Sequence, residues 1–517
     1  MSGIRRQSAL AAVGLLVLAC SGAPNYEGRT PAPPDHPRWP PPQPTAAWEP
    51  PQTPYPDVTF EDAGVNPFRD PIRDPYSTFA MDVDTASYGV ARRFIEDGNL
   101  PPRDAVRLEE FVNAFDYGYR APLEEAFAVH VDGGPTPFAG RETLWLRIGI
   151  QAHVIADAER RPASLTFVID TSGSMQMEDR LDLVKEALRV LVAGLGADDS
   201  VAIVEFGTEA RVVLNPTSAA EPEVILDAIA ALHADGSTNA QAGLELGYDV
   251  ALRGHRRGAI DRVVLASDGV ANVGLTDADR ILRRIDREVE AGIDLVAIGV
   301  GMGNFNDALL EQLANRGNGF YAYINDRRDA ERLFGERLTS TLQTVARDAK
   351  VQVEFRPQAV SRYRLLGYEN RAIADEDFRD PHVDAGEVGA GHSVTALYEI
   401  EPLDLRGSDG FLGTVRLRWT DPDARDGLFL PAGEHELAAD VEMFAFYPDW
   451  LEADPGFQLA ATVGGFAEIL RDSPYARGYT LDDVAVEADH LARAFDGRSD
   501  VAEFSQLASR AARIGLR

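Results

Sequence analysis

The chain has 517 residues, of which 45% are hydrophobic and 26% charged, a length that suits about two to four globular domains. Asp and Glu total 83 against 50 Lys and Arg, which gives a formal net charge of −33 at pH 7. A charge of this sign repels phosphate, so nucleic acids and anionic membrane surfaces are excluded as partners. The single cysteine excludes an intrachain disulfide.

The first twenty residues (1–20) are predicted to be an export signal. Two arginines precede an apolar core, Ala9 to Ala19, which is too short to span a bilayer as a mature helix. Leu18-Ala19-Cys20-Ser21 then resembles the lipobox of bacterial lipoproteins, which implies cleavage before Cys20 and a lipid on its thiol. Ser21 favours the outer membrane by the sorting rule of such proteins, so we expect a lipid-anchored protein of the cell envelope. Ordinary cleavage nearby, with Cys20 unused, is the alternative.

Two segments of different composition follow the signal. Residues 21–57 are dense in proline and are expected to form an extended spacer rather than helix or sheet. Residues 58–160 then form an N-terminal flanking region. Its patterns predict a strand at 78–83, helices at 88–96 and 103–115, and strands between 127 and 153, where apolar and polar residues alternate.

One short stretch of this region suggests catalysis. Asp82-Val83-Asp84-Thr85 is similar to the D-x-D-x-T/V start of some hydrolases, but Ala86 stands where the fifth residue of that motif belongs. A strand end followed by a helix N-cap at Asp84 or Thr85 is the simpler interpretation. The chain contains no H-E-x-x-H metal motif, no G-x-S-x-G nucleophile turn and no phosphate-binding loop. We therefore predict that the protein is not an enzyme.

Residues 161–347 are predicted to form an α/β domain. Short, nearly continuous apolar strands alternate with amphipathic helices, which is typical of a doubly wound, mostly parallel sheet with helices on both faces. The strands are expected at 164–169, 201–206, 210–214, 262–267, 293–299 and 320–324, and the helices at 178–195, 222–233, 239–252, 277–291, 306–315 and 327–346.

Three polar loops of this domain carry candidate ligands. The first strand ends in Asp170-Thr171-Ser172-Gly173-Ser174, a later strand ends in Ser267-Asp268-Gly269, and Gly236-Ser237-Thr238-Asn239 precedes a helix. All three loops can meet at the carboxyl edge of the sheet, where such folds bind ligands. Their oxygens are hard ligands of the kind that Mg2+ takes. Each fragment alone is more often an N-cap or a turn.

Together and in this order, the loops resemble the metal-ion-dependent adhesion site of von Willebrand factor A (VWA) domains. Asp170, Ser172, Ser174, Thr238 and Asp268 match all five metal-site positions. The resemblance implies a bound Mg2+, with Mn2+ or Ca2+ as alternatives, held directly by the three hydroxyls and largely through water by the two carboxylates. It also implies that an acidic side chain of a partner protein completes the coordination.

The flanking regions carry a second resemblance. Ser77–Tyr88 with Leu100–Arg107, and Tyr363–Arg371 with Val383–His392, resemble the regions that flank the VWA domain in a family of bacterial VWA lipoproteins. Residues 348–517 are predicted to be a C-terminal β domain with terminal helices at 457–471, 482–496 and 499–514. We expect the strands of 127–153 and 349–446 to form one antiparallel β-sandwich, with the VWA domain inserted in it. The strands after the VWA domain are expected near 351–355, 394–400, 415–419 and 441–446.

The sequence thus predicts a lipid-anchored envelope protein that binds an unknown partner protein through a Mg2+-dependent VWA site. Two other hypotheses stay open. In the first, the protein is a structural or assembly factor of the envelope, and the metal only stabilises the fold. In the second, it is an envelope hydrolase that uses Asp82 and Asp84.

Overall fold

The computed structural model describes Tyr55, Phe60 and most of the chain beyond them. The described ranges are 60–81, 84–140, 142–269, 275–301, 307–336, 338–383, 385–403, 410–422 and 433–515. The predicted export signal with Cys20, nearly all of the proline-rich spacer, and Asp82 lie outside these ranges.

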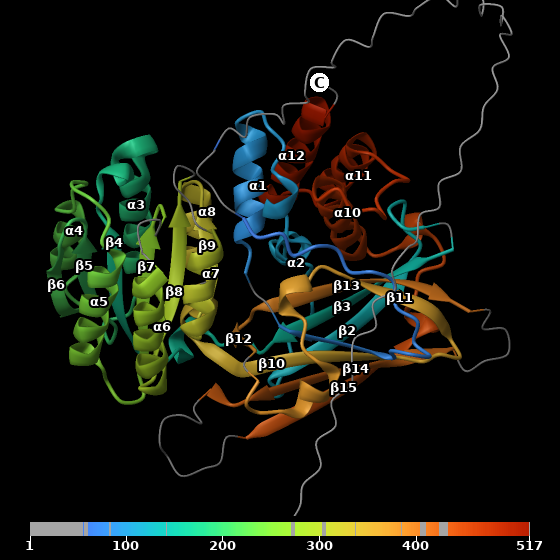
Figure 1. Cartoon of the computed structure of the whole chain (residues 1–517), viewed down its shortest axis with the longest axis horizontal. Helices are drawn as coiled ribbons and strands as arrows, with labels where there is room; N and C mark the ends of the chain where they lie inside the picture. The colour runs from blue at the N-terminus through green and yellow to red at the C-terminus, as the bar shows by residue number, and fades with distance from the viewer. Residues whose placement is uncertain are drawn as a thin grey trace, which may run out of the picture. The chain divides into compact units, whose positions relative to one another are not determined.

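The middle of the chain forms a six-stranded sheet in the order β6-β5-β4-β7-β8-β9 (Figure 1). All neighbouring strands are parallel except β6, which pairs antiparallel to β5 at the edge. Every residue of β4, β7 and β8 is buried, as expected for parallel strands covered on both faces. The strands are β4 (Ala163–Asp170), β5 (Ser200–Phe206), β6 (Ala210–Ser218), β7 (Ile260–Ser267), β8 (Ile293–Val300) and β9 (Tyr321–Ile324).

Helices cover both faces of this sheet, so the predicted doubly wound α/β fold is confirmed. One hydrophobic core joins the sheet to α3 (Arg180–Gly194), α4 (Pro222–Ala230) and the helical segment after β9. A separate core joins the opposite face to α5 (Ala240–Gly254), α6 (Leu275–Glu290) and α7 (Asp307–Arg316).

Two antiparallel sheets flank this domain and share one hydrophobic core. The first has the order β1-β10-β14-β15, with β12 also paired to β10, and the second has the order β11-β13-β3-β2. The expected β-sandwich is therefore present. Its strands are β1 (Tyr76–Ala80), β2 (Phe127–Gly134), β3 (Leu144–Ala152), β10 (Thr344–Phe355), β11 (Val360–Leu366), β12 (Gly386–Gly389), β13 (Ser393–Pro402), β14 (Phe411–Thr420) and β15 (Glu434–Glu442).

The α/β domain is an insertion in this sandwich. Strands β1, β2 and β3 precede the domain in the chain, and all the other sandwich strands follow it. The two parts of the chain meet where β3 pairs with β13, with Ile148 opposite Ala396, and where β1 pairs with β10, with Phe79 opposite Val351. During synthesis, the sandwich can therefore be completed only after the inserted domain has been translated.

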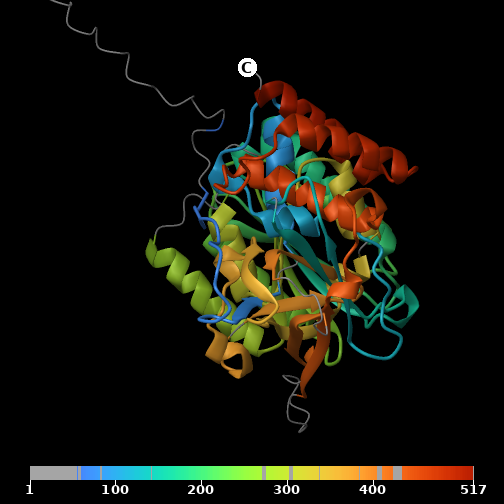
Figure 2. The ribbon, with the colours of Figure 1, turned by 90° about the vertical axis from the view of Figure 1, so that its right-hand side faces the viewer.

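Five helices form a third body with its own core (Figure 1, Figure 2). The C-terminal helices α10–α12 lie beside α1 in both views, although about 400 residues separate them along the chain. Helix α10 is almost entirely buried, and Asp454 caps its N-terminus by accepting hydrogen bonds from the amides of Gly456 and Phe457. The helices are α1 (Ala86–Glu96), α2 (Leu108–Asn113), α10 (Pro455–Leu470), α11 (Leu481–Ala494) and α12 (Ser499–Gly515).

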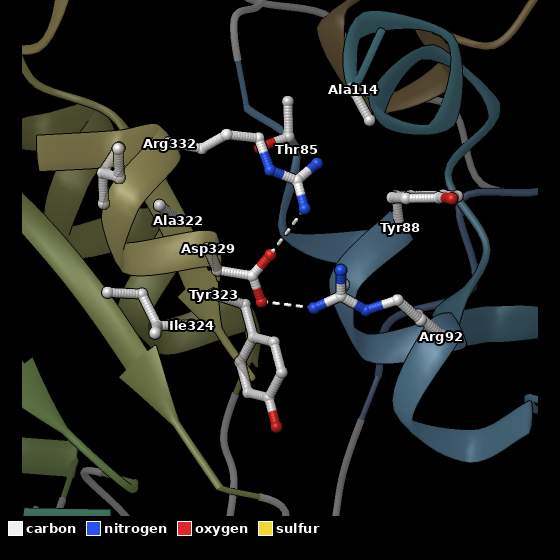
Figure 3. A pocket seen from close by; sticks show the side chains of 11 residues that line it. Thr85, Tyr88, Arg92, Ala114, Ala322, Tyr323, Ile324, Asp329 and Arg332 are labelled. Atoms are coloured by element: carbon white, nitrogen blue, oxygen red, sulfur yellow. Dashed lines mark hydrogen bonds and ion pairs between the residues drawn. The ribbon is translucent and has the colours of Figure 1, made fainter. Parts of the chain in front are cut away.

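Buried ion pairs join this helical body to the α/β domain. Arg92 of α1, only 1% exposed, pairs with Asp329 of α8 (Arg327–Glu331) and lies 2.7 Å from Glu503 of α12. Figure 3 shows the Asp329 carboxylate between the guanidinium groups of Arg92 and Arg332. The Arg92 guanidinium thus connects α1 with α8 and α12, three helices that are distant in sequence.

A second buried cluster contains Asp84, whose role was left open by the sequence. One oxygen of Asp84 accepts the amide of Tyr321 at 2.8 Å, and the other lies 2.9 Å from Arg371. Arg371 also pairs with Glu311 of α7, which in turn pairs with Arg107. Thr85 is the N-cap residue of α1, but its side chain makes no capping hydrogen bond. Asp84 therefore joins the N-terminal flank to β9 and to the segment after β11.

Two predicted helices are shorter than expected. The helix expected at 103–115 divides into a short 3-10 turn (Arg103–Ala105) and α2, because the Ser87 hydroxyl bonds both the Ala105 carbonyl and the Arg107 amide between them. The helix expected at 327–346 consists of α8, a π-helical turn (Arg332–Glu336) and α9 (Leu338–Leu342). It ends there because the buried Arg262 donates to the carbonyl of Leu342 and to the hydroxyl of Thr344, where β10 begins.

The last strand was predicted near 441–446, which is wrong: β15 already ends at Glu442, and a short 3-10 turn follows it. Strands β11 and β12 were not predicted. No helix within the described ranges is long and apolar enough to cross a membrane.

The Arg92 cluster predicts a large effect of one substitution. Arg92→Ala should lower the free energy of unfolding by about 3–5 kcal/mol, because Asp329 and Glu503 then lose a buried cation. Arg493→Ala is the matched control, since Arg493 is 65% exposed and pairs with Asp489 one turn earlier in α11. This change should cost at most about 0.5 kcal/mol. Chemical denaturation measures both, and equal losses would contradict the assigned role of Arg92.

Candidate metal centre

The candidate centre lies at the carboxyl edge of the six-stranded sheet. Strands β4 and β7 are parallel neighbours, with Ile169 opposite Ala266, so Asp170 and Asp268 follow directly at the same edge. The helix that follows β4 in the chain, α3, packs on one face of the sheet, whereas the helix that follows β7, α6, packs on the other. Such a change of face between neighbouring strands opens the crevice in which α/β sheets bind ligands.

Asp170 is the innermost group of the centre, with no exposed surface. Its Oδ1 accepts the amide of Ser172 at 2.8 Å, and its Oδ2 accepts the hydroxyl of Ser267 at 2.6 Å. Burial raises the pKa of Asp170 to about 6, although both hydrogen bonds act in the opposite direction. The site thus holds a carboxylate whose charge is poorly compensated, and a nearby cation would stabilise it.

Ser172, Ser174 and Asp268 form a chain of oxygens above Asp170. The hydroxyls of Ser172 and Ser174 are 3.0 Å apart, and the Ser174 hydroxyl donates to Asp268 Oδ1 at 3.1 Å. Ser172 and Asp268 are buried, whereas Ser174 is half-buried. Of these three side chains, only that of Ser174 therefore reaches partly toward the surface.

Thr238 comes from the third loop, which two backbone hydrogen bonds hold against the first. The amide of Asp235 donates to the Thr171 carbonyl at 2.7 Å, and the amide of Gly173 donates to the Gly236 carbonyl at 3.0 Å. Gly236 has a φ of +84°, and a side chain there would overlap Thr208, so the tight turn requires glycine. The half-buried Thr238 follows two residues later.

Helix capping does not account for the hydroxyls. Ser172 precedes a 3-10 turn (Gly173–Asp179) but makes no side-chain capping bond. Helix α5 is capped by Asn239, which accepts from the amide of Ala242, and not by Thr238. The turn at Asp268-Gly269 is stabilised by Ser267, which accepts the Gly269 amide at 3.2 Å. The usual capping and turn roles of Thr238 and Asp268 are thus filled by their neighbours, Asn239 and Ser267.

The structure also places a cation at the centre that the sequence analysis missed. Arg180, the first residue of α3, is buried and lies 2.7 Å from Asp268 Oδ2. A sequence signal existed, because an arginine in the first turn of a helix opposes the helix dipole and calls for a nearby carboxylate. Ser267 belongs to the predicted Ser267-Asp268-Gly269 loop. Its bond to Asp170 depends on the register of β4 and β7, which the sequence does not reveal.

These residues suit a hard divalent cation. Mg2+ takes oxygen ligands in octahedral geometry and keeps several positions for water or a partner. Hydroxyls of Ser172 and Ser174, with the Thr238 loop beside them, offer such oxygens next to two carboxylates. In the part of the chain that the structure describes, no group of three or more His, Cys, Asp or Glu is placed to hold a metal. A metal centre here would therefore depend on the hydroxyls.

Comparison with known protein families agrees with this architecture. The family model of the von Willebrand factor type A domain matches residues 164–336, and one described as von Willebrand factor matches residues 55–145. A third, described as the C-terminal region of uncharacterized protein YfbK, matches residues 340–514. The inserted α/β domain is thus a VWA domain, a class of domain that commonly mediates interactions between proteins.

Several curated proteins are similar to this chain. Uncharacterized protein YfbK of Escherichia coli is 39% identical over 359 residues, 68% of this chain and 62% of that protein. Uncharacterized protein sll0103 of Synechocystis is 28% identical over 54% of this chain and 66% of that protein. The chain therefore spans less than two thirds of the length of these relatives. The human inter-alpha-trypsin inhibitor heavy chain H3 is 24% identical over 47% of this chain and 29% of its own length.

Among solved structures, a von Willebrand factor type A protein from Catenulispora acidiphila is 18% identical, with a TM-score of 0.41 over 74% of this chain and 88% of that chain. The three family matches follow one another along the chain and leave only residues 146–163 and 337–339 between them. The chain belongs to a bacterial family of VWA-domain proteins that carry a YfbK-type C-terminal region.

The hydrogen bond from Ser267 to Asp170 predicts the effect of a second substitution. Ser267→Ala should lower the free energy of unfolding by about 1–3 kcal/mol, because a fully buried carboxylate oxygen then loses its donor. Ser237→Ala is the control, because its exposed hydroxyl lies 3.4 Å from that of Thr208 and buried groups do not depend on it. Urea denaturation of both variants makes the comparison, and an unchanged Ser267→Ala protein would show that Asp170 does not need this bond.

Proposed function

We propose that this protein binds another protein through a Mg2+-dependent site in its VWA domain. The observation that carries the proposal is the run of oxygens from Ser172 through Ser174 to Asp268, above the buried carboxylate of Asp170. Ser172 makes no helix-capping bond, and the cap of α5 is Asn239 rather than Thr238.

In the proposed site, Ser172, Ser174 and Thr238 hold the cation directly, and Asp170 and Asp268 act on it largely through water. Mn2+ and Ca2+ are alternatives to Mg2+ as the resident ion. A bound cation supplies a Lewis-acidic position that accepts an oxygen ligand from outside the chain. Neutral hydroxyls neutralise little of its charge, so an acidic side chain of the partner is the favoured ligand.

The proposed place of action is the cell envelope. Support comes from the sequence alone: an apolar segment that ends at Cys20 and a proline-rich spacer before the first described elements. In this proposal a lipid on Cys20 anchors the protein, in the outer membrane by the identity of Ser21, and the spacer separates the folded body from the membrane.

A structural or assembly role is the second candidate. It is favoured by hydrogen bonds that already join the three loops of the centre. Thr171 and Gly173 bond the loop of Thr238, and Ser174 bonds Asp268. In that case a metal ion would strengthen an existing arrangement and would not be needed for contact with a partner. Asp84 gives the hydrolase hypothesis no support, because its carboxylate is held by Arg371 and the Tyr321 amide.

Replacement of Asp170 distinguishes metal-dependent partner binding from the structural role. Asp170→Ala should abolish Mg2+ binding, measured by calorimetric titration of chelator-treated protein, because the buried anion that favours the cation is lost. Asp198→Ala is the matched control, because Asp198 is an exposed carboxylate just before β5, at the opposite edge of the sheet.

Capture of a partner from envelope extracts is then compared in Mg2+ and in chelator. The proposed function requires capture that is lost both in chelator and with Asp170→Ala. Capture that persists under both conditions would contradict it. If chelation only lowers the melting temperature and leaves capture intact, the structural candidate is the correct one.

A further inference from the structure

We propose that Arg180 sets the charge of the metal centre: it neutralises Asp268, so that the centre binds a bare divalent cation weakly and keeps positive charge for an acidic ligand. This inference deepens the proposed function and rests on it. Arg180 acts through Asp268 and is therefore a positioning residue of the site rather than a ligand.

The first argument is the geometry of Asp268. Its Oδ2 lies 2.7 Å from Nη1 of Arg180, and its Oδ1 accepts the hydroxyl of Ser174 at 3.1 Å. Both oxygens of this carboxylate are thus already bound by groups of the chain itself. The side chains of Arg180 and Asp268 are 4% and 2% exposed, so water screens their attraction little.

The second argument is that the fold makes room for the guanidinium. Gly301, the residue after β8, has a φ of +71°, and a Cβ at this position would lie 2.2 Å from Nε of Arg180. Any side chain at Gly301 would displace the arginine. Gly301 at the end of a third strand therefore leaves open the space that the Arg180 side chain occupies.

The charge balance of the centre follows from these contacts. Asp170 and Asp268 together carry two negative charges, and Arg180 returns the sum to a single negative charge. A divalent cation would then leave the centre with one positive charge, which an acidic side chain of a partner neutralises. Without Arg180 the two carboxylates would balance the cation by themselves, and the partner's charge would add little.

The test compares Mg2+ affinity in three proteins of full length: the unaltered chain, Arg180→Gln and Arg180→Lys. Titration calorimetry uses Mg2+ alone as the probe, after treatment with chelator. Arg180→Gln should bind Mg2+ at least about tenfold more tightly, because a positive charge close to the cation is removed. Arg180→Lys keeps the charge and should stay within about threefold of the unaltered chain.

Circular dichroism melting curves in chelator show whether each variant is folded. If Arg180→Gln does not fold, Gly301→Ala replaces it, since that change displaces the guanidinium and should also raise Mg2+ affinity. Affinity that is unchanged or lower in a folded variant, with the unaltered chain binding Mg2+, would overturn the role of Arg180 and leave the proposed metal site standing. If none of the proteins binds Mg2+, the proposed function fails and this inference fails with it.

Discussion

The structure of the VWA domain depends on a carboxylate that is withdrawn from water at the end of a strand. Asp170 has no exposed surface, and its two oxygens are served by Ser172 in the following loop and by Ser267 at the end of the neighbouring strand. The Ser267 donor reaches Asp170 only if β4 and β7 lie side by side in the observed register. A buried carboxylate without hydrogen-bond donors would be very costly. The buried position of Asp170 therefore depends on β7 lying next to β4.

The same principle joins the three bodies of the molecule. Arg92, Arg107 and Arg371 each bring a cation to carboxylates of the α/β domain that neighbouring segments also contact. Because the α/β domain is inserted between β3 and β10, such contacts orient it on the sandwich and on the helices. Buried pairs of this kind add specificity of arrangement more reliably than net stability. Whatever binds at the sheet edge would thus act on a domain held from several sides.

Much of this architecture could be predicted from the sequence. The largely apolar strands β4, β7 and β8 and their alternation with helices define the α/β domain. The alternation in Leu144–Ile150 predicts the strand that pairs across the insertion. The five candidate ligands were found because their order along the chain matches a known site. Four of them belong to one hydrogen-bonded group in the structure, and Thr238 lies on a loop bonded to the same segment.

What the sequence did not reveal depends on contacts between distant residues. The partners of Arg180 and Ser267 follow from strand order, and the ends of α2 and α9 are set by Ser87 and Arg262 from other elements. Strand β12 is only four residues long, and it is a strand because it pairs with β10. Local patterns carry no information of this kind, since periodicity describes a segment and not its neighbours.

The central claim is that the hydroxyls at the edge of the sheet hold a divalent cation. A crystal structure of the protein grown with Mn2+ in place of Mg2+ tests it most directly, because the anomalous signal of manganese locates the ion independently of the refined coordinates. The account predicts an anomalous peak within bonding distance of the Ser172 and Ser174 hydroxyls, with Thr238 beside it. A peak at another place in the molecule, or none in crystals that contain Mn2+, would contradict the account.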